Sequence, residues 1–139
     1  MDSYKHIETA TGRFIAGKYH RAVEVGIGRN TVAAEMLAQA GVLMRCTDVK
    51  NLEHPSHLFF VNDDVFEPDF TLYRGADVIY AIRPGIEMIP PLVALAREIN
   101  SDLIVCHLGF ELYGDGGETI DCGIVLHRYW KRSEPVKEG

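Results

Sequence analysis

The apolar positions of this sequence follow two different periods, and each period predicts a different kind of element. Near the start they recur every three or four residues, which predicts an amphipathic helix from about Tyr4 to Tyr19. Farther along, short runs that are apolar at most positions predict strands, some of them buried on both faces. The runs that we interpret as strands are Arg21–Val25, Val42–Asp48, Leu58–Val61, Asp77–Ile82, Asp102–His107 and Gly123–Trp130.

Helical patterns separate some of these strands. Thr31–Ala40 carries an apolar stripe and ends at Gly41, and Pro91–Ile99 begins at a proline, which a helix tolerates only in its first turn. The stretch Gly109–Asp121 is rich in glycine and has no helical period, so we expect a loop there. A parallel return normally needs a helical crossover. We therefore expect Gly123–Trp130 to run antiparallel to the strand before it.

Strands that alternate with helices predict an α/β fold of three layers around a mostly parallel sheet of about six strands. The helix before the first strand is expected to pack on the sheet or to cover its ligand edge. The length of 139 residues suits one Rossmann-like domain over residues 1–139, and the hydrophobic fraction of 47% suits a buried core. In such sheets a ligand binds outside the carboxyl ends of the strands, where the strand order reverses.

Charge and cysteine content narrow the setting. The net charge of −6 gives no indication of nucleic acid or an acidic membrane as a partner, and we interpret the basic stretch His127–Arg132 as a solvated chain end. The three cysteines, Cys46, Cys106 and Cys122, have no metal-binding spacing, which indicates reduced thiols and a cytoplasmic location. No apolar run approaches the roughly 20 residues that span a membrane.

The stretch Arg21–Val32 combines a strand, a tight turn and a helix start. Glycines at Gly26 and Gly28 allow positive φ and let a ligand approach the backbone. Asn30 or Thr31 can cap the following helix, whose first N–H groups have no partner within the helix. Such a turn favours a negatively charged ligand group.

Two ligand patterns compete for this turn. A dinucleotide turn reads G-x-G-x-x-G, and Thr31 stands in place of its third glycine, which disfavours NAD(P). The other pattern is an acidic residue followed by x-Gly-x-Gly-x-Gly at the end of the first strand. Residues Glu24–Asn30 depart from it only at the last glycine, and asparagine tolerates the left-handed conformation better than most residues.

With this turn, the chain resembles the class I S-adenosylmethionine-dependent methyltransferase fold from Arg21 to about His107. The Ala-Ile-Arg-Pro-Gly sequence of residues Ala81–Gly85, together with the small size, is similar to a small uncharacterised archaeal family of methyltransferase-like Rossmann domains. The resemblance implies S-adenosylmethionine as the cofactor. It implies no particular methyl acceptor.

The resemblance also implies roles for individual residues. The turn would hold the amino-acid end of the cofactor, with Glu24 near its ammonium group. Asp48 matches the acidic residue that binds the ribose hydroxyls, and Asp63 or Asp64 matches the residue that contacts the adenine amine. From the residues alone, Asp48 could equally cap a turn, and one of the two later aspartates could form an Asx turn. The expected cofactor-binding residues are Glu24, Gly26, Ile27, Gly28, Asn30, Asp48, Asp63 and Asp64.

Candidates for catalysis lie at the ends of the fourth and fifth strands, and they are Arg83, Tyr80 and His107. Arg83 precedes Pro-Gly, so its backbone is restricted and its planar fork could hold a carboxylate or phosphate. An ion pair with Glu87 is the alternative. His107 could be a general base or a hydrogen-bonded histidine of the core. We expect no metal site, because Pro55 interrupts the only suggestive histidine pair.

Some features depart from the methyltransferase pattern. Residues Ile82–Gly85 stand where the enzymes that modify amino groups of bases or glutamine usually carry Asn/Asp-Pro-Pro-aromatic. The sheet is expected to lack the usual final helix and one strand. An acceptor site would then come from Arg83–Ile89, from Gly109–Asp121, from the N-terminal helix, or from a second subunit or protein partner.

Three hypotheses therefore stand. The first is a small S-adenosylmethionine-dependent methyltransferase of unknown acceptor. The second is a catalytically inactive nucleoside-binding or partner domain of the same fold. The third is an NAD(P)-binding domain.

Overall fold

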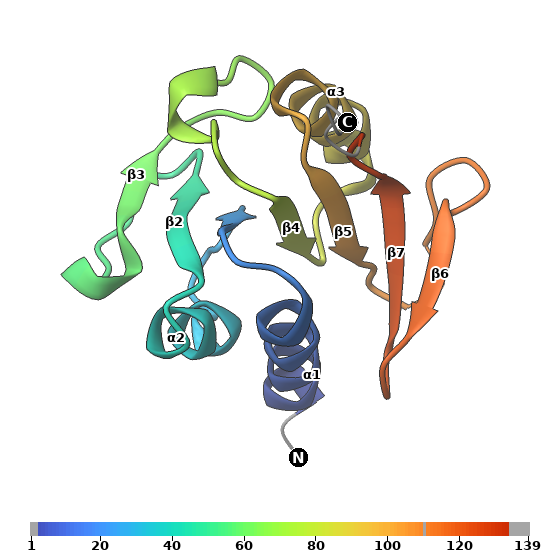
Figure 1. Cartoon of the computed structure of the whole chain (residues 1–139), viewed down its shortest axis with the longest axis horizontal. Helices are drawn as coiled ribbons and strands as arrows, with labels where there is room; N and C mark the ends of the chain where they lie inside the picture. Colours follow the sequence, from blue (N-terminus) through green and yellow to red (C-terminus); the bar gives the residue numbers. More distant parts are fainter. Residues whose placement is uncertain (1–2, 110, 134–139) are drawn as a thin grey trace, which may run out of the picture.

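In the computed structural model, which describes residues 3–109 and 111–133, the strands form one sheet in the order β3-β2-β1-β4-β5-β7-β6 (Figure 1). Strands β1 to β5 pair in parallel, whereas β7 is antiparallel to β5 and β6 is antiparallel to β7. The expected α/β fold and the antiparallel last strand are thus confirmed. The strands are β1 (Ala22–Val25), β2 (Leu43–Asp48), β3 (Phe60–Asn62), β4 (Val78–Ile82), β5 (Asp102–Cys106), β6 (Glu118–Asp121) and β7 (Val125–Trp130).

Strand β6 corrects the sequence-based prediction. It lies inside the stretch Gly109–Asp121, where a loop was expected, and pairs with β7 from Glu118 opposite Arg128 to Asp121 opposite Val125. Most of its side chains are exposed, so it carries no run of apolar residues that would indicate a strand. The sheet therefore has seven strands, and the expectation of a missing strand is wrong. No helix lies between β5 and β6 in the described residues 107–109 and 111–117.

Helices cover both faces of the sheet. The helices α1 (Ser3–Lys18) and α2 (Val32–Gln39) lie on one face, and α3 (Ile89–Ile99) lies on the other (Figure 1). Because successive side chains of a strand point to opposite faces, each strand contributes to both cores. In β1, Ala22 packs on the side of α1 and α2, and Val23 packs on the side of α3. Single 3₁₀ turns occur at η1 (Ser56–Leu58), η2 (Phe70–Leu72) and η3 (Ile86–Met88).

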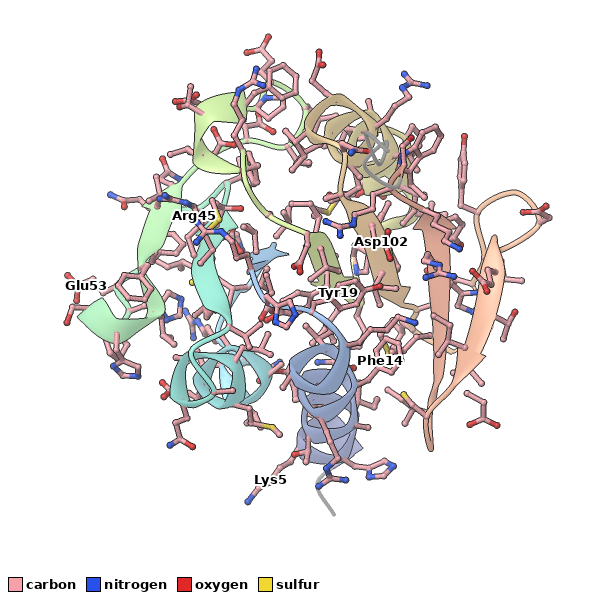
Figure 2. The ribbon with its side chains drawn as sticks, in the orientation of Figure 1. Lys5, Phe14, Tyr19, Arg45, Glu53 and Asp102 are labelled. Carbon is pink, nitrogen blue, oxygen red and sulfur yellow. The ribbon has the colours of Figure 1, made fainter. Side chains whose placement is uncertain are left out.

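A close contact fixes α1 against α2. A Cβ atom at Gly12 would lie 3.3 Å from Ala33 Cα and 3.1 Å from Met36 Sδ, so only glycine fits without a shift. At the other end of α1, the Tyr19 hydroxyl donates to Asp102 Oδ2 at 2.6 Å (Figure 2). The first helix is therefore held at two points, and its first turns lie beside the helix that follows the glycine turn.

The cysteines behave as small apolar residues. All three are free thiols, and Cys46 and Cys106 are buried. Among the described helices, none combines the length and the apolar character that a membrane crossing requires.

Candidate ligand-binding site

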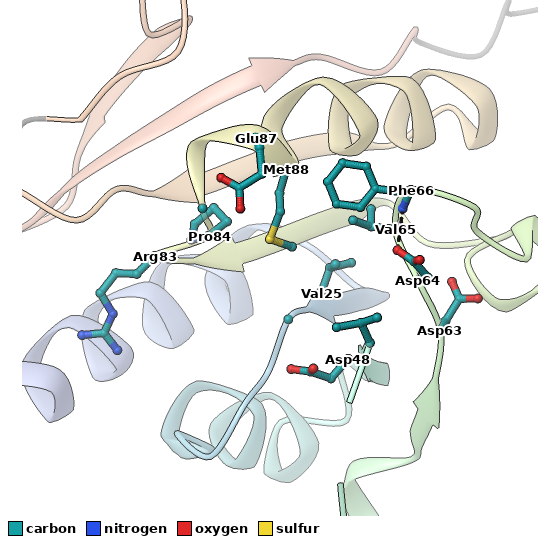
Figure 3. A pocket seen from close by; sticks show the side chains of 13 residues that line it. Val25, Asp48, Asp63, Asp64, Val65, Phe66, Arg83, Pro84, Glu87 and Met88 are labelled. Carbon is teal, nitrogen blue, oxygen red and sulfur yellow. Dashed lines mark hydrogen bonds between the residues drawn. The ribbon is translucent and has the colours of Figure 1, made fainter. Parts of the chain in front are cut away.

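A cavity of about 410 Å³ opens at the carboxyl ends of β1, β2, β3 and β4 (Figure 3). This is where the strand order reverses, because β2 and β3 follow β1 on one side and β4 and β5 lie on the other. Its apolar wall includes Val25, Val65 and Met88. Its polar groups are the backbone at Gly26 and a set of acidic side chains at the strand ends.

The glycine turn has the geometry that its sequence predicted. Gly26 and Gly28 have φ angles of 75° and 56°, which side chains other than glycine rarely adopt. The N–H groups of Gly26 and Ile27 both donate to Thr47 O, at 2.9 and 3.1 Å. These bonds fasten the turn to the end of β2.

Only part of this turn faces the cavity. Gly26 lines it, whereas Gly28 lines a smaller neighbouring cavity of about 380 Å³. Ile27 is buried in the core beneath α1 and α2, and Asn30 is exposed and lines neither cavity.

The start of α2 differs from the expectation of free N–H groups. Thr31 occupies the cap position, but its side chain makes no capping hydrogen bond. Instead, the N–H of Ala33 donates to Oε1 of Glu8 on α1 at 2.9 Å, and Glu8 is buried. A carboxylate of the chain itself therefore holds a donor that the sequence pattern assigned to a ligand.

Asp48 stands at the end of β2, on the rim of the cavity. Its Oδ2 accepts from the N–H of Gly28 at 2.8 Å, and its Oδ1 accepts from the N–H of Lys50 at 2.9 Å. The two bonds fix the orientation of the carboxylate. Because each carboxylate oxygen has two acceptor positions, Asp48 can still accept further hydrogen bonds from a ligand.

Asp63 and Asp64 follow β3 and line the same cavity. Oδ2 of Asp63 accepts from the Tyr73 hydroxyl at 2.5 Å, which holds this carboxylate toward the protein. Oδ1 of Asp64 accepts from the N–H of Phe66 at 3.0 Å, and this is the Asx turn that the sequence offered as an alternative. In the described part of the chain, Oδ2 of Asp64 has no hydrogen bond.

Glu24 and Tyr80 lie under the sheet edge and not in the cavity. Both are fully buried, and the Tyr80 hydroxyl donates to Oε1 of Glu24 at 2.6 Å. Burial, and then the charge of Glu8, raise the pKa of Glu24 well above its ordinary range. Burial and the charge of Glu24 likewise raise the pKa of Tyr80. With no exposed surface, Tyr80 can contact no acceptor in this structure.

Arg83 contributes to the cavity wall, but its charge lies elsewhere. Its φ angle of 54° is uncommon for a residue other than glycine, and its N–H donates to Cys106 O at 2.6 Å. The guanidinium carbon lies 3.8 Å from the centre of the Tyr4 ring, and the side chain points away from the cavity (Figure 3). No ion pair joins it to Glu87, whose carboxylate folds over Gly85.

His107 follows β5 and belongs to a different cluster. It contacts the Tyr129 hydroxyl through Nε2, and the His127 ring lies 5.1 Å from it, centre to centre. The Tyr129 hydroxyl also accepts from the N–H of Tyr113 at 3.1 Å. Burial, reinforced by His127, lowers the pKa of His107, which favours the neutral ring. None of these rings lines the cavity. Sequence reasoning missed Tyr113 and Tyr129 because the second lies in the stretch interpreted as a solvated chain end.

The two histidines with metal-like spacing have separate partners. His54 Nε2 lies 3.0 Å from Gly28 O, and His57 Nε2 lies 2.7 Å from a Glu35 oxygen. Within residues 3–109 and 111–133, no group of three or more metal-ligating side chains is found.

The cavity is acidic. Asp48, Asp63, Asp64 and Glu87 line it, and none of them belongs to an ion pair within the described residues. The one cationic residue in its wall, Arg83, directs its guanidinium onto Tyr4. Such a surface attracts cations and hydrogen-bond donors and repels anions.

Among solved structures, the chain is similar to the methyltransferase domain of bacterial CtHen1, with a TM-score of 0.50 and 11% sequence identity. The likeness covers 73% of this chain and 64% of the solved one, so this chain spans less than two thirds of that structure. At this identity the likeness shows a methyltransferase-like fold and nothing about chemistry.

Sequence comparison identifies a family. A protein of Archaeoglobus fulgidus is 39% identical over 103 residues, which cover 73% of this chain and 76% of that protein. A protein of Pyrococcus horikoshii is 30% identical over 114 residues, which cover 78% of this chain and 87% of that protein. Both bear the name UPF0146 protein, and the model of the uncharacterised protein family UPF0146 matches residues 7–115. The chain therefore belongs to the archaeal UPF0146 family.

Proposed function

We propose that the cavity at the ends of β1 to β4 binds S-adenosylmethionine or a closely related adenosine compound. One observation carries this proposal. The carboxylates of Asp48, Asp63 and Asp64, which have no ion-pair partner among the described residues, stand on neighbouring strand ends around one cavity of about 410 Å³. Its volume lies in the usual range for small-molecule sites, roughly 300–1,000 Å³.

Each end of the ligand finds suitable chemistry. Asp48 is oriented by two backbone N–H groups and accepts hydrogen bonds from the ribose hydroxyls. The unbonded oxygen of Asp64 accepts from the adenine amine, and the purine ring packs on Val65 and Met88. The 5′ substituent extends toward Gly26, because the turn lies on the strand next to β2.

The charge of the cavity favours a sulfonium cofactor over a dinucleotide. S-adenosylmethionine carries a cationic sulfur and an ammonium group, whereas NAD carries a pyrophosphate. Four acidic side chains line the cavity, and the Arg83 charge is directed elsewhere. Electrostatic complementarity therefore supports the first ligand and disfavours the second.

A ligand-binding domain without methyl transfer is the second candidate. Three placements favour it, because Tyr80 is buried, His107 lies outside the cavity and the Arg83 guanidinium points away. Release of S-adenosylhomocysteine from bound cofactor, measured with candidate acceptors, separates methyl transfer from binding alone.

Calorimetric titration tests the proposal. The native chain should bind S-adenosylmethionine and S-adenosylhomocysteine more tightly than NAD. Asp48→Asn should lower both affinities by at least about tenfold, because hydrogen bonds to a charged acceptor are lost. Asp77→Asn is the matched control, since Asp77 also accepts a backbone N–H on each oxygen but lies at the start of β4. The control should change the affinities by less than about twofold.

Two outcomes would contradict the proposal. One is no binding of either sulfur compound at millimolar concentration. The other is an equal loss of affinity in Asp48→Asn and Asp77→Asn, which would mean that the ligand binds elsewhere.

A further inference from the structure

The buried carboxylate of Glu8 occupies a position that a ligand would use in a phosphate-binding turn. A helix that begins just after a glycine turn commonly holds a phosphate on its first N–H groups. Here α2 has no side-chain cap of its own, and the N–H of Ala33 donates to Glu8 at 2.9 Å. Only 2% of the Glu8 surface is exposed, so water screens its charge little.

The surroundings of Glu8 reinforce this effect. Burial raises the pKa of Glu8, while the Ala33 N–H and the Arg83 charge favour its ionised form. Arg83 is the cation named beside it, and its guanidinium stacks on Tyr4. On the other side of the turn, Asp48 holds the N–H of Gly28. Two donors of the turn region are thus bonded to carboxylates of the chain.

We infer that Glu8 is a specificity-determining residue, which excludes adenosine ligands with a 5′-phosphate from the cavity. The inference rests on the proposed function. With the ribose on Asp48, the 5′ substituent points to the neighbouring strand end, where Gly26 and the start of α2 lie. A phosphate there meets an occupied N–H group and a negative charge. A sulfonium group or an uncharged substituent meets no such repulsion.

The experiment compares adenosine with 5′-AMP, because their affinity ratio isolates the contribution of the phosphate. Calorimetry should show that the native chain binds 5′-AMP at least about tenfold more weakly than adenosine. In Glu8→Gln the amide oxygen can still accept from Ala33, but the charge is gone. This variant should narrow the ratio by about tenfold and leave the adenosine affinity within about twofold.

Glu35→Gln is the matched control. Glu35 lies in the first turn of the same helix, but its side chain is partly exposed and pairs with His57. Removing this charge should leave the ratio within about twofold of the native value, because solvent screens it. Glu8→Met, which is neutral and of similar length, repeats the test if Glu8→Gln does not fold.

The possible results are distinguishable. A narrowed ratio in the neutral variants of Glu8 and not in Glu35→Gln supports the inference. Native-like ratios in the folded Glu8 variants, with adenosine still bound, overturn the inference and leave the proposed function standing. If neither adenosine nor S-adenosylhomocysteine binds the native chain, the proposed function fails and the inference fails with it.

Discussion

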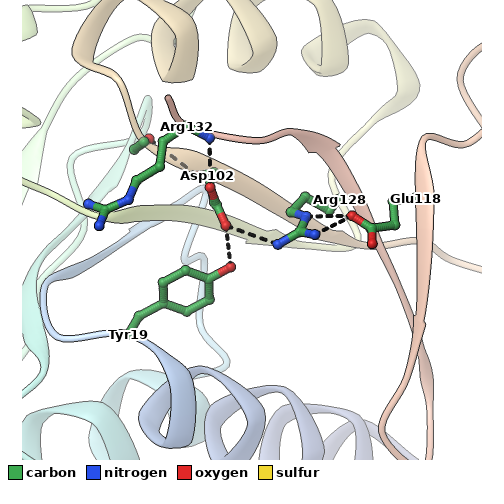
Figure 4. A network of polar contacts seen from close by, with 6 residues as sticks. Tyr19, Asp102, Glu118, Arg128 and Arg132 are labelled. Atoms are coloured by element: carbon green, nitrogen blue, oxygen red, sulfur yellow. Dashed lines mark hydrogen bonds and ion pairs between the residues drawn. The ribbon is translucent and has the colours of Figure 1, made fainter. Parts of the chain in front are cut away.

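The two edges of the sheet treat their carboxylates differently. At the carboxyl edge, Asp48 and Asp64 line a cavity and have no ion-pair partner among the described residues. At the opposite edge, Asp102 forms an ion pair with Arg128 at 3.3 Å (Figure 4). Asp102 also accepts from the Tyr19 hydroxyl at 2.6 Å and from the N–H of Arg132 at 2.8 Å.

The opposite edge also has a cavity, of about 460 Å³, but its charges are mixed. Lys18, Arg128 and Lys131 line it together with Asp77 and Asp102. Arg128 bridges two acids, because its Nε donates to Glu118 at 2.7 Å while its Nη1 contacts Asp102. This comparison teaches that an aspartate at a sheet edge indicates a ligand site only when the protein leaves its charge without a cationic partner.

Asp102→Asn should give the largest effect on the comparison. It leaves Arg128 facing one acid instead of two and disrupts the bond from Tyr19, which ties α1 to the sheet. Removal of one partner of a buried ion pair should lower the free energy of unfolding by about 3 kcal/mol, measured by urea denaturation. The affinity for S-adenosylmethionine should stay within about twofold of the native value. A loss of affinity without a loss of stability would break the comparison.

Glu24→Gln sharpens the comparison, because Glu24 belongs to the carboxyl edge but faces the interior. Its pKa is raised by burial, and Glu8 and Asp48 add to this, so the folded state binds its proton more tightly than the unfolded state. This stabilisation is complete below the ordinary pKa of 4.5 and is lost as the pH rises through the raised value.

The native chain should therefore lose stability as the pH rises above about 4.5, and Glu24→Gln should reduce this loss by an amount on the order of 1 kcal/mol. Urea denaturation at several pH values from 4 to 9 measures it. Parallel pH profiles for the native chain and the variant would show that Glu24 does not titrate in this range.

Arg83→Ala should have the smallest effect. The contact with Tyr4 is worth about 0.5–1 kcal/mol at a partly exposed site, so unfolding should become easier by about that amount. Arg97→Ala is a suitable control, because Arg97 lies over the Trp130 ring at 5.7 Å. Since the Arg83 guanidinium points away from the cavity, cofactor affinity should hardly change in either variant. A large loss in Arg83→Ala alone would place its charge at the ligand.

Much of the fold follows from local patterns. The buried strands were predictable because their apolar runs are bounded by turn residues. The positions of Asp48, Asp63 and Asp64 followed from chain order, since each comes at the end of a strand in a parallel sheet. Strand β6 was not predictable from periodicity, because most of its side chains face solvent.

Other features of the site depend on contacts between distant residues. The bond from Ala33 to Glu8 joins residues 25 apart, and no local pattern indicates it. The orientation of Glu24 did leave a signal. Glu24 and Val25 are neighbours on one strand, so they must point to opposite faces, and only Val25 lines the cavity. Strand alternation alone could have separated them.

The bond between Asp48 and Gly28 has a consequence for how binding proceeds. Ordering a free side chain at an interface costs roughly 0.5–1.5 kcal/mol. Asp48 is already held by the backbone N–H groups of Gly28 and Lys50 before any ligand arrives. The end of β2 is thus preorganised, and recognition there loses no rotamer entropy.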